Sequence, residues 1–202
     1  TEDKETQDSG KADSSCPTDV FMDLSKAAGP GANYDAPKMA VSCTDESLNV
    51  KSNGLPHYAY VSMTPNGLSS QNHNWSVALK PKLTGNDTPI ACLGDVGFSI
   101  NGIPIYGANE AQMPDPYGDP VANNMMDECE GHTGGRGDYH YHALKFRCLT
   151  NPQSIDGKES LGKPSPILGY ALDGFPIYGS FGCIDKECKK VVEFKSSWEP
   201  TQ

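Results

Sequence analysis

The sequence predicts a mainly β domain with low helix content, formed as a disulfide-braced sandwich or barrel-like structure that contains two repeated β-hairpins. Three observations predict this class. No window keeps a 3.6-residue apolar period over three helical turns. Glycine and proline, with 21 and 16 residues, interrupt nearly every candidate helix. The seven cysteines are typical of a small, loop-rich domain whose apolar core alone gives marginal stability.

The N-terminal segment differs in composition from the rest of the chain. Residues 1–15 contain no large apolar side chain, so burial cannot offset the entropy cost of ordering them, and we expect a disordered leader. We expect residues 16–202 to form a single domain. The apolar residues at 20–24 predict a strand or a short helix, and the alternation at 58–63 and at 75–79 predicts two strands.

An internal repeat organises the second half of the chain. Residues 97–107, Gly-Phe-Ser-Ile-Asn-Gly-Ile-Pro-Ile-Tyr-Gly, recur as residues 169–179, Gly-Tyr-Ala-Leu-Asp-Gly-Phe-Pro-Ile-Tyr-Gly. Each copy contains an Asn-Gly or Asp-Gly pair, which favours a two-residue type I′ turn. Each copy is therefore predicted to form a β-hairpin, and the two hairpins to be related by a pseudo-twofold axis.

The predicted turn fixes which residues of a hairpin face each other. In the first copy Ile100 would lie opposite Ile103, and the ring of Tyr106 would cover the bare backbone of Gly97. Proline donates no backbone hydrogen bond, so Pro104 and its counterpart in the second copy predict edge strands or unpaired outward positions. We expect the repeat to build the scaffold; a binding groove between the copies is the alternative.

The cysteines and the charge indicate a compartment and exclude some partners. Seven cysteines allow at most three bridges within the chain and leave one thiol for a partner, and the number favours a secreted or extracytoplasmic protein. A formal net charge of −10 repels phosphate backbones, so nucleic acid is not an expected partner. No stretch reaches the roughly 18 consecutive apolar residues of a membrane-spanning helix, so membrane insertion is not expected.

A cluster of histidines is the sharpest chemical signal. His132, His140 and His142 fall within eleven positions. If residues 139–142 form a strand, His140 and His142 share one face with Cα atoms about 6.5 Å apart, and two such imidazoles can meet one ion. Tyr139 and Tyr141 then share the opposite face, where their rings are expected in the core.

Further residues complete the predicted site. The glycine-rich loop at 131–137 can fold His132 toward the same face, and three imidazoles favour Zn²⁺ or Cu²⁺ over Mg²⁺. His57, which follows a turn, is a candidate fourth ligand or a partner that orients a ligand. Glu130 and Asp138 beside the cluster are candidates to orient the imidazoles or a metal-bound water. A disulfide between the flanking Cys129 and Cys148 would clamp the histidine strand.

A second, weaker metal signal lies before the histidines. A proline-rich loop offers oxygen donors that are possible calcium ligands, although their spacing departs from the twelve-residue calcium loop. These donors are Asp115, Tyr117, Asp119, Asn123 and Asn124.

The residues around the histidines resemble a known family. Tyr139-His140-Tyr141-His142, preceded by Cys129-x-Gly-His132, is similar to the signature of the YHYH-domain protein family. The resemblance extends from about residue 43 to residue 183 and includes residues 53–57 and the repeated Gly-x-Pro-Ile-Tyr-Gly hairpins. It implies a secreted domain with a shared histidine-rich element and implies no particular reaction.

Three classes of function remain open from the sequence. The first is a secreted metal-binding protein with a histidine-rich copper or zinc site, and the second is a metalloenzyme that uses an open metal position for hydrolytic or redox chemistry. The third is a metal-free structural or adhesive matrix protein, in which the imidazoles bond to carbonyl groups or face solvent. No nucleophile elbow, metalloprotease helix or phosphate-binding loop is present, so the catalytic residues of an enzyme are unknown.

Overall fold

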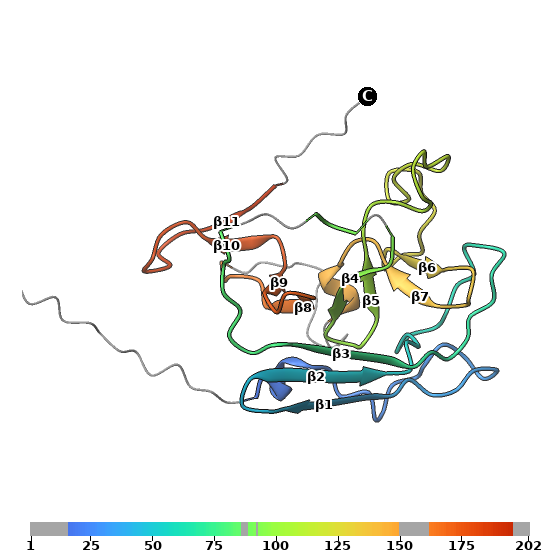
Figure 1. Ribbon diagram of the computed structural model, residues 1–202, viewed down its shortest axis with the longest axis horizontal. Coiled ribbons are helices and arrows are strands. Elements are labelled where there is room, and N and C mark those ends of the chain that lie inside the picture. Colours follow the sequence, from blue (N-terminus) through green and yellow to red (C-terminus); the bar gives the residue numbers. More distant parts are fainter. Residues whose placement is uncertain (1–15, 86–88, 92, 150–161, 196–202) are drawn as a thin grey trace, which may run out of the picture.

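The computed structural model describes residues 16–85, 89–91, 93–149 and 162–195. The predicted leader at 1–15 lies outside these residues. The described chain is mainly β, and its helical segments are two short 3₁₀ turns, η1 (Thr18–Val20) and η2 (Phe146–Cys148). The low helix content expected from the sequence is confirmed. The strands, shown in Figure 1, are β1 (Met39–Cys43), β2 (Ser47–Ser52), β3 (His73–Ala78), β4 (Asp95–Ser99), β5 (Pro104–Tyr106), β6 (Gly131–Thr133), β7 (Tyr139–Tyr141), β8 (Ile167–Ala171), β9 (Pro176–Tyr178), β10 (Phe181–Cys183) and β11 (Val191–Glu193).

The strands form three sheets in the described part of the chain. A three-stranded sheet has the order β1-β2-β3, a six-stranded sheet the order β6-β7-β5-β4-β8-β9, and β10 pairs with β11. In Figure 1 the first sheet lies along the lower side of the six-stranded sheet. The six-stranded sheet ends at β6 and β9 and does not close on itself. The fold is therefore sandwich-like, and the barrel-like alternative does not apply.

The inward-facing apolar side chains of β2 and β3 form the interface between the two larger sheets. Leu48 and Val50 of β2 and Trp75 of β3 point inward, while the residues between them are more exposed. They pack against Phe98 of β4 and Tyr170 of β8, and Phe98 is fully buried between the rings of Trp75 and Tyr170. This is the packing expected where two twisted sheets face each other across one apolar core.

The repeated hairpins form β4–β5 and β8–β9, and they meet through their first strands. Strands β4 and β8 are antiparallel, with Phe98 paired to Tyr170, the equivalent residue of the other copy. A pseudo-twofold axis therefore passes between these two residues, as the repeat predicted. A Cβ on Gly97 would lie 2.6 Å from the carbonyl oxygen of Tyr170, and one on Gly169 would lie 2.6 Å from that of Phe98. Glycine is thus required for close pairing of the two copies.

The turns of the hairpins differ from the prediction. The N–H of Ser99 donates to the carbonyl of Ile103, and the N–H of Gly102 donates to the carbonyl of Ser99, so the loop has three residues. Gly102 has φ +77°, whereas Asn101 does not have a positive φ. A three-residue loop with one left-handed glycine replaces the predicted type I′ turn. Phe98 consequently pairs with Pro104, one position away from the predicted register.

Three further expectations are corrected. Residues 58–63 form no strand, because the hydroxyls of Tyr58 and Tyr60 bond to side chains of β6 and β7 and the segment has no strand partner. Of the two strands that begin with the repeated proline, β5 is not at an edge, because Ile105 pairs in parallel with Tyr141 of β7, whereas β9 is an edge strand. The strand predicted at 75–79 is confirmed as β3. The predicted strand or short helix at 20–24 is absent: Val20 is the last residue of η1, and residues 21–24 are neither helix nor strand.

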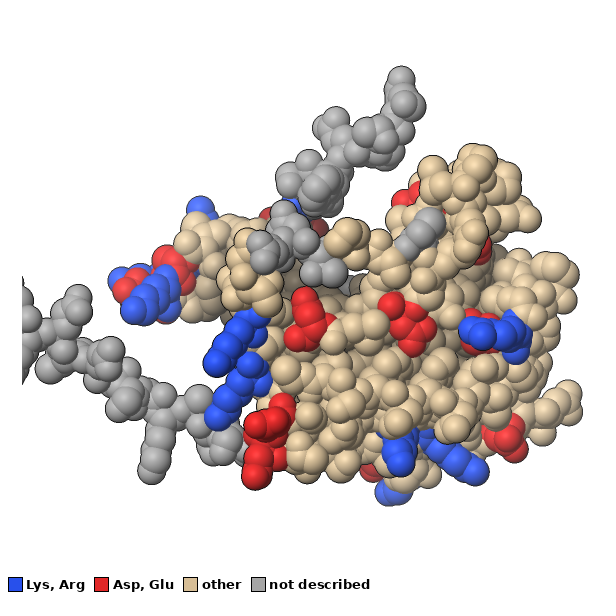
Figure 2. All heavy atoms as spheres, in the orientation of Figure 1, with Lys and Arg blue, Asp and Glu red and all other residues tan. Residues whose placement is uncertain are grey.

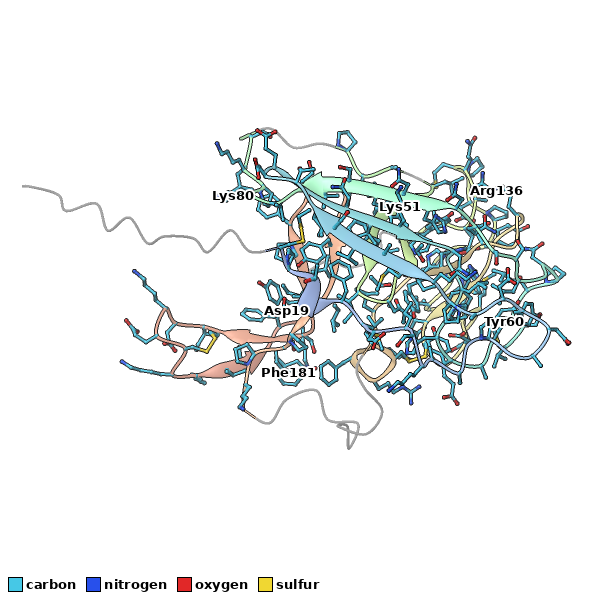
Figure 3. The ribbon with its side chains drawn as sticks, turned by 90° about the horizontal axis from the view of Figure 1, so that it is seen from below. Asp19, Lys51, Tyr60, Lys80, Arg136 and Phe181 are labelled. Carbon is cyan, nitrogen blue, oxygen red and sulfur yellow. A yellow bond between two sulfur atoms is a disulfide. The ribbon has the colours of Figure 1, made fainter. Side chains whose placement is uncertain are left out.

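Three disulfides stabilise the described chain, and one of them lies beside the histidines. They are Cys16–Cys43, Cys129–Cys148 and Cys183–Cys188, so the predicted clamp at Cys129 is confirmed. The seventh cysteine, Cys92, lies outside the described residues. Figure 3 shows β10–β11, with the third disulfide, projecting from the body at the end away from Arg136. None of the described helical segments is long and apolar enough to cross a membrane.

Candidate metal centre

The hairpin β6–β7 brings the three clustered histidines together. His132 of β6 lies directly opposite His140 of β7 in the antiparallel register. His140 of β7 and His142, which directly follows the last residue of β7, lie on one face because side chains alternate along an extended chain, and Tyr139 and Tyr141 are buried on the other face at 0% and 1% exposure. The faces assigned to these residues from the sequence are confirmed. Parallel pairing of β5 with β7 then places the loop after β5 beside the imidazoles.

A glutamate from that loop completes the cluster. The Oε1 atom of Glu110 lies 3.0 Å from Nε2 of His132 and 2.8 Å from Nε2 of His142. The Nε2 atoms of His140 and His142 are 3.1 Å apart. The four residues can therefore direct one nitrogen or oxygen atom each to a common point, with all four atoms within 4.8 Å of one another.

The other ring nitrogen of each histidine faces a backbone carbonyl. Nδ1 of His132 lies 3.2 Å from the oxygen of Met125, and Nδ1 of His142 lies 2.7 Å from that of Gly107. Nδ1 of His140 lies 3.1 Å from the oxygen of Asp138. A carbonyl oxygen only accepts, so each Nδ1 carries the proton. In the neutral ring this leaves the lone pair on Nε2, directed at the common point.

Burial determines the charges at this point. The side chains of His132 and His142 are each 1% exposed. Burial, together with repulsion from the two neighbouring histidines, lowers the pKa of His140 to about 4. Burial raises the pKa of Glu110, but hydrogen bonds and positive charge from His132 and His142, when these rings carry a proton on Nε2, lower that pKa by more, so Glu110 carries a negative charge. Glu110 Oε1 and His132 Nε2 lie 3.0 Å apart, but neither buried atom has a partner in hydrogen-bond geometry among the described residues.

Asp115 holds the backbone that carries Glu110. Its Oδ2 accepts hydrogen bonds from the N–H groups of Glu110 at 2.8 Å and Ala111 at 3.2 Å, and its Oδ1 accepts from Tyr117 at 2.9 Å. Asp119 likewise accepts backbone hydrogen bonds within the same loop. These two carboxylates, considered above as calcium ligands, thus use their oxygens to shape the loop that presents Glu110.

Asp138 and Tyr106 form a wall beside His140. Asp138 Oδ2 accepts a hydrogen bond of 2.8 Å from the Tyr106 hydroxyl and lies 3.7 Å from Nδ1 of His140. The Tyr106 ring stacks on the His140 imidazole, with centroids 3.9 Å apart. Asp138 therefore contacts an imidazole, as its position in the sequence suggested. Glu130, the other candidate, forms an ion pair with Lys145 and is not among the four converging residues.

His57 lies on the tyrosine face of β7. Its Nδ1 accepts a hydrogen bond of 3.1 Å from the Asn101 amide, which also donates to the Tyr141 hydroxyl at 3.0 Å. The Tyr58 hydroxyl bonds to those of Tyr139 and Tyr141 at 3.0 and 2.8 Å. His57 is thus part of a buried phenol network, and Glu110 occupies the place beside the three histidines for which His57 was considered.

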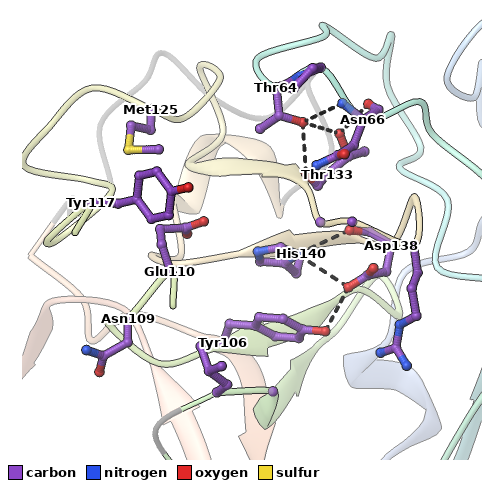
Figure 4. A pocket seen from close by; sticks show the side chains of 16 residues that line it. Thr64, Asn66, Tyr106, Asn109, Glu110, Tyr117, Met125, Thr133, Asp138 and His140 are labelled. Atoms are coloured by element: carbon purple, nitrogen blue, oxygen red, sulfur yellow. Dashed lines mark hydrogen bonds and ion pairs between the residues drawn. The ribbon is translucent and has the colours of Figure 1, made fainter. Parts of the chain in front are cut away.

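A cavity of about 690 Å³ opens beside the four residues. Glu110 and His140 line it, while His132 and His142 lie behind them. Figure 4 shows Glu110, His140, Tyr106 and Asp138 along one side of this cavity. The cavity therefore gives access to the cluster at Glu110 and His140.

Comparison with known proteins identifies a family. A family model described as YHYH protein matches residues 74–202, which is more than half of the 202-residue chain. The chain belongs to the YHYH protein family. No match was found among curated proteins or among solved structures.

The part of this YHYH protein that matches the family contains all four converging residues and both hairpins, whereas His57 precedes it. The sequence alone did not indicate Glu110 or the contact of Tyr106 with His140. Glu110 has no local signal, because an isolated glutamate in a loop is a common surface residue. Its one distinguishing feature is that it follows a strand that pairs beside the histidine strand, and that pairing is visible only in the fold.

Proposed function

We propose that this protein binds one transition-metal ion, copper or zinc, through His132, His140, His142 and Glu110. The observation that carries the proposal is the orientation of the donor atoms. Three imidazoles whose Nδ1 atoms face backbone carbonyls direct their Nε2 atoms at one buried point, and a carboxylate oxygen lies beside them. The Nε2 lone pairs and the Glu110 carboxylate repel one another where water is excluded. A cation bound between them removes this repulsion, because all four groups can coordinate it.

The donor set and the distances support copper or zinc. Imidazole with one carboxylate suits these ions, whereas Mg²⁺ and Ca²⁺ prefer oxygen ligands. A tetrahedral zinc site with bonds of 2.0–2.1 Å separates its donors by about 3.3 to 3.4 Å. Three of the donor pairs here lie at 2.8, 3.0 and 3.1 Å, so an ion requires movements of only a few tenths of an ångström at these contacts.

A location outside the cytosol is the second part of the proposal. Three disulfides in the described chain are consistent with an extracellular or periplasmic protein, because reducing compartments keep such thiols unpaired. The bridge Cys129–Cys148 joins the segments on either side of the histidine hairpin. An oxidising compartment would therefore also keep the metal-binding hairpin in place.

Metal analysis tests the proposal. Untagged protein is stripped with chelator, reloaded separately with Cu²⁺ and Zn²⁺, desalted and measured by plasma mass spectrometry. We expect about one ion per wild-type chain and none in the His140→Ala/His142→Ala double variant. His57→Gln is the matched control, because it alters a partly buried histidine outside the cluster and should retain the ion. A wild-type protein that retains neither metal would overturn the proposal.

The metalloenzyme alternative is favoured by one observation, the cavity that reaches Glu110 and His140. A site that serves only to store a metal or to stabilise the fold needs no such access, because structural sites are closed. The metal-free matrix alternative has a different consequence. It predicts that Cu²⁺ and Zn²⁺ leave the free energy of unfolding unchanged.

A further inference from the structure

We propose that the cavity beside the metal centre binds a small carboxylate anion, which adds a fifth ligand to the metal and pairs with Arg136. This inference rests on the proposed metal site. It adds the chemical class of a ligand and a residue that selects it. Three observations carry it: the route to the centre, the charge of the cavity and the polar groups that line it.

The route to the centre leads to one side of the ion. The side chains of His132 and His142 are almost completely buried, but Glu110 is 16% exposed and forms the cavity wall with His140. A ligand that enters the cavity therefore meets the metal between these two residues. The stacking of Tyr106 on His140 and the hydrogen bond of Tyr106 to Asp138 keep this wall in place.

The net charge of the groups that line the cavity, counted together with the ion, changes from negative to positive when a divalent ion is bound. Its charged lining consists of Glu110, Asp138 and Arg136. The two carboxylates balance the charge of a divalent ion, so the guanidinium leaves a net positive charge. In the described part of the chain no carboxylate lies within ion-pair distance of Arg136, while Arg147 and Lys145 both have partners. Arg136 is therefore free to pair with an incoming anion.

The remaining polar lining suits a small oxyanion. Asn66, Asn109 and Tyr117 bring amide and hydroxyl groups to the cavity, whereas the Thr64 hydroxyl donates to the Thr133 carbonyl. Hydroxyl and amide N–H groups can donate to carboxylate oxygens, and guanidinium pairs with a carboxylate in a planar, two-bond geometry. A carboxylate can place one oxygen on the metal and leave the other for these donors. The volume of about 690 Å³ admits a small organic acid.

The test uses the full chain loaded with Co²⁺, a coloured substitute for zinc, and acetate as the probe. Acetate is titrated at constant ionic strength while the visible d–d absorption of the bound cobalt is recorded. We expect a saturable change in the spectrum, and an apparent acetate affinity about tenfold weaker in Arg136→Gln, which loses one charge-assisted pair. Arg147→Gln is the matched control, because Arg147 lies outside this cavity and pairs with Glu128. It should behave as the wild type.

The possible results separate the two proposals. Cobalt bands that do not respond to acetate would overturn the anion site and leave the metal site standing. An acetate response of equal affinity in Arg136→Gln would overturn the assignment of Arg136 as its partner. Absence of cobalt bands before acetate is added would overturn the metal site and this inference together.

Discussion

Each imidazole of the centre has its two ring nitrogens in different surroundings. The Nδ1 atoms of His132, His140 and His142 bond to three backbone carbonyls, from Met125, Asp138 and Gly107. These bonds select the tautomer and fix the ring plane, so the donor atoms are oriented before an ion arrives. In the metal-free protein this fixed arrangement of donor atoms lowers the free energy of unfolding, because buried Glu110 Oε1 and His132 Nε2 have no hydrogen-bond partner among the described residues.

Replacement of Glu110 should change metal affinity and stability in opposite directions. In Glu110→Gln the side-chain amide can donate to Nε2 of His132 or His142, so we expect the metal-free protein to gain about 1 kcal/mol in free energy of unfolding. Loss of the anionic ligand should weaken Zn²⁺ binding by at least about tenfold. Urea denaturation with chelator present and a competition titration with a chromophoric chelator measure the two effects. A less stable metal-free variant would contradict the unpaired state of these atoms.

His57 should contribute to the loss of stability in acid. Burial lowers the pKa of His57, so the folded protein keeps it neutral where the unfolded chain begins to take up a proton. Stability is therefore lost as pH falls through the unfolded pKa of about 6.5, until the folded pKa is reached. We expect the free energy of unfolding, measured by urea denaturation with chelator present, to decrease less between pH 7.5 and 5.5 in His57→Gln than in the wild type. Equal decreases would contradict this role.

At the scale of secondary-structure elements, a loop and two strand pairs assemble the site. The hairpin β6–β7 supplies the histidines, β5 pairs with β7, and the loop after β5 supplies Glu110. The repeat contributes indirectly, because β4 and β5 form one copy and β4 is held by β8 of the other. The duplicated hairpins thus hold the strand that precedes Glu110 beside the strand that carries the histidines of the candidate metal centre.

The loop that carries Glu110 should depend on Asp115. Asp115→Ala removes the acceptor of the Glu110 and Ala111 N–H groups, so the carboxylate of Glu110 is less well oriented. We expect metal affinity to fall about tenfold, as for other residues that orient ligands. Asp119→Ala is the matched control: it removes hydrogen bonds to Val121 and Ala122 in the same loop but none to Glu110. Chelator competition measures both variants, and equal losses would contradict a specific role for Asp115.

Close pairing of the two repeat copies should depend on Gly97. Gly97→Ala places a methyl group 2.6 Å from the Tyr170 carbonyl oxygen in a strand pair that cannot separate without loss of its hydrogen bonds. We expect a loss of about 2 to 3 kcal/mol in free energy of unfolding by urea denaturation. Gly67→Ala is the control, since its Cβ would meet no atom within 4 Å. A change in Gly97→Ala as small as that in the control would contradict the required contact.

At the scale of the whole molecule, the metal centre and the apolar core are two sides of one strand. Tyr139 and Tyr141 of β7 belong to a core cluster that also includes Leu55, Ile103 and Leu168. His140 and His142 project from the opposite face. Charged side chains are dispersed over the face shown in Figure 2, and much of that face is uncharged. The net charge of −10 is therefore not concentrated in a patch there.

Metal binding should stabilise the entire described fold. The metal ligands lie on a loop and two strands that also pack against the apolar core. An ion that binds only the folded chain therefore increases the free energy of unfolding of the whole unit. At a free metal concentration 100 times Kd the gain is about 2.7 kcal/mol. Thermal denaturation with and without Zn²⁺ should show a higher Tm with metal in the wild type and no shift in the His140→Ala/His142→Ala variant. A shift of equal size in that variant would indicate binding elsewhere.

The sequence by itself determined the mainly β class, the two repeated hairpins and the strand face shared by His140 and His142, and it favoured a bridge between Cys129 and Cys148 without fixing the cysteine pairing. These follow from local rules, because alternation along a strand and short loops between cysteines depend on neighbouring residues. Only the tertiary structure decided the three-residue turns, the place of His57 and the presence of Glu110. Glu110 reaches the histidines because β5 pairs with β7 and Asp115 shapes the loop between them. Those contacts join residues far apart in the chain, and no local pattern encodes them.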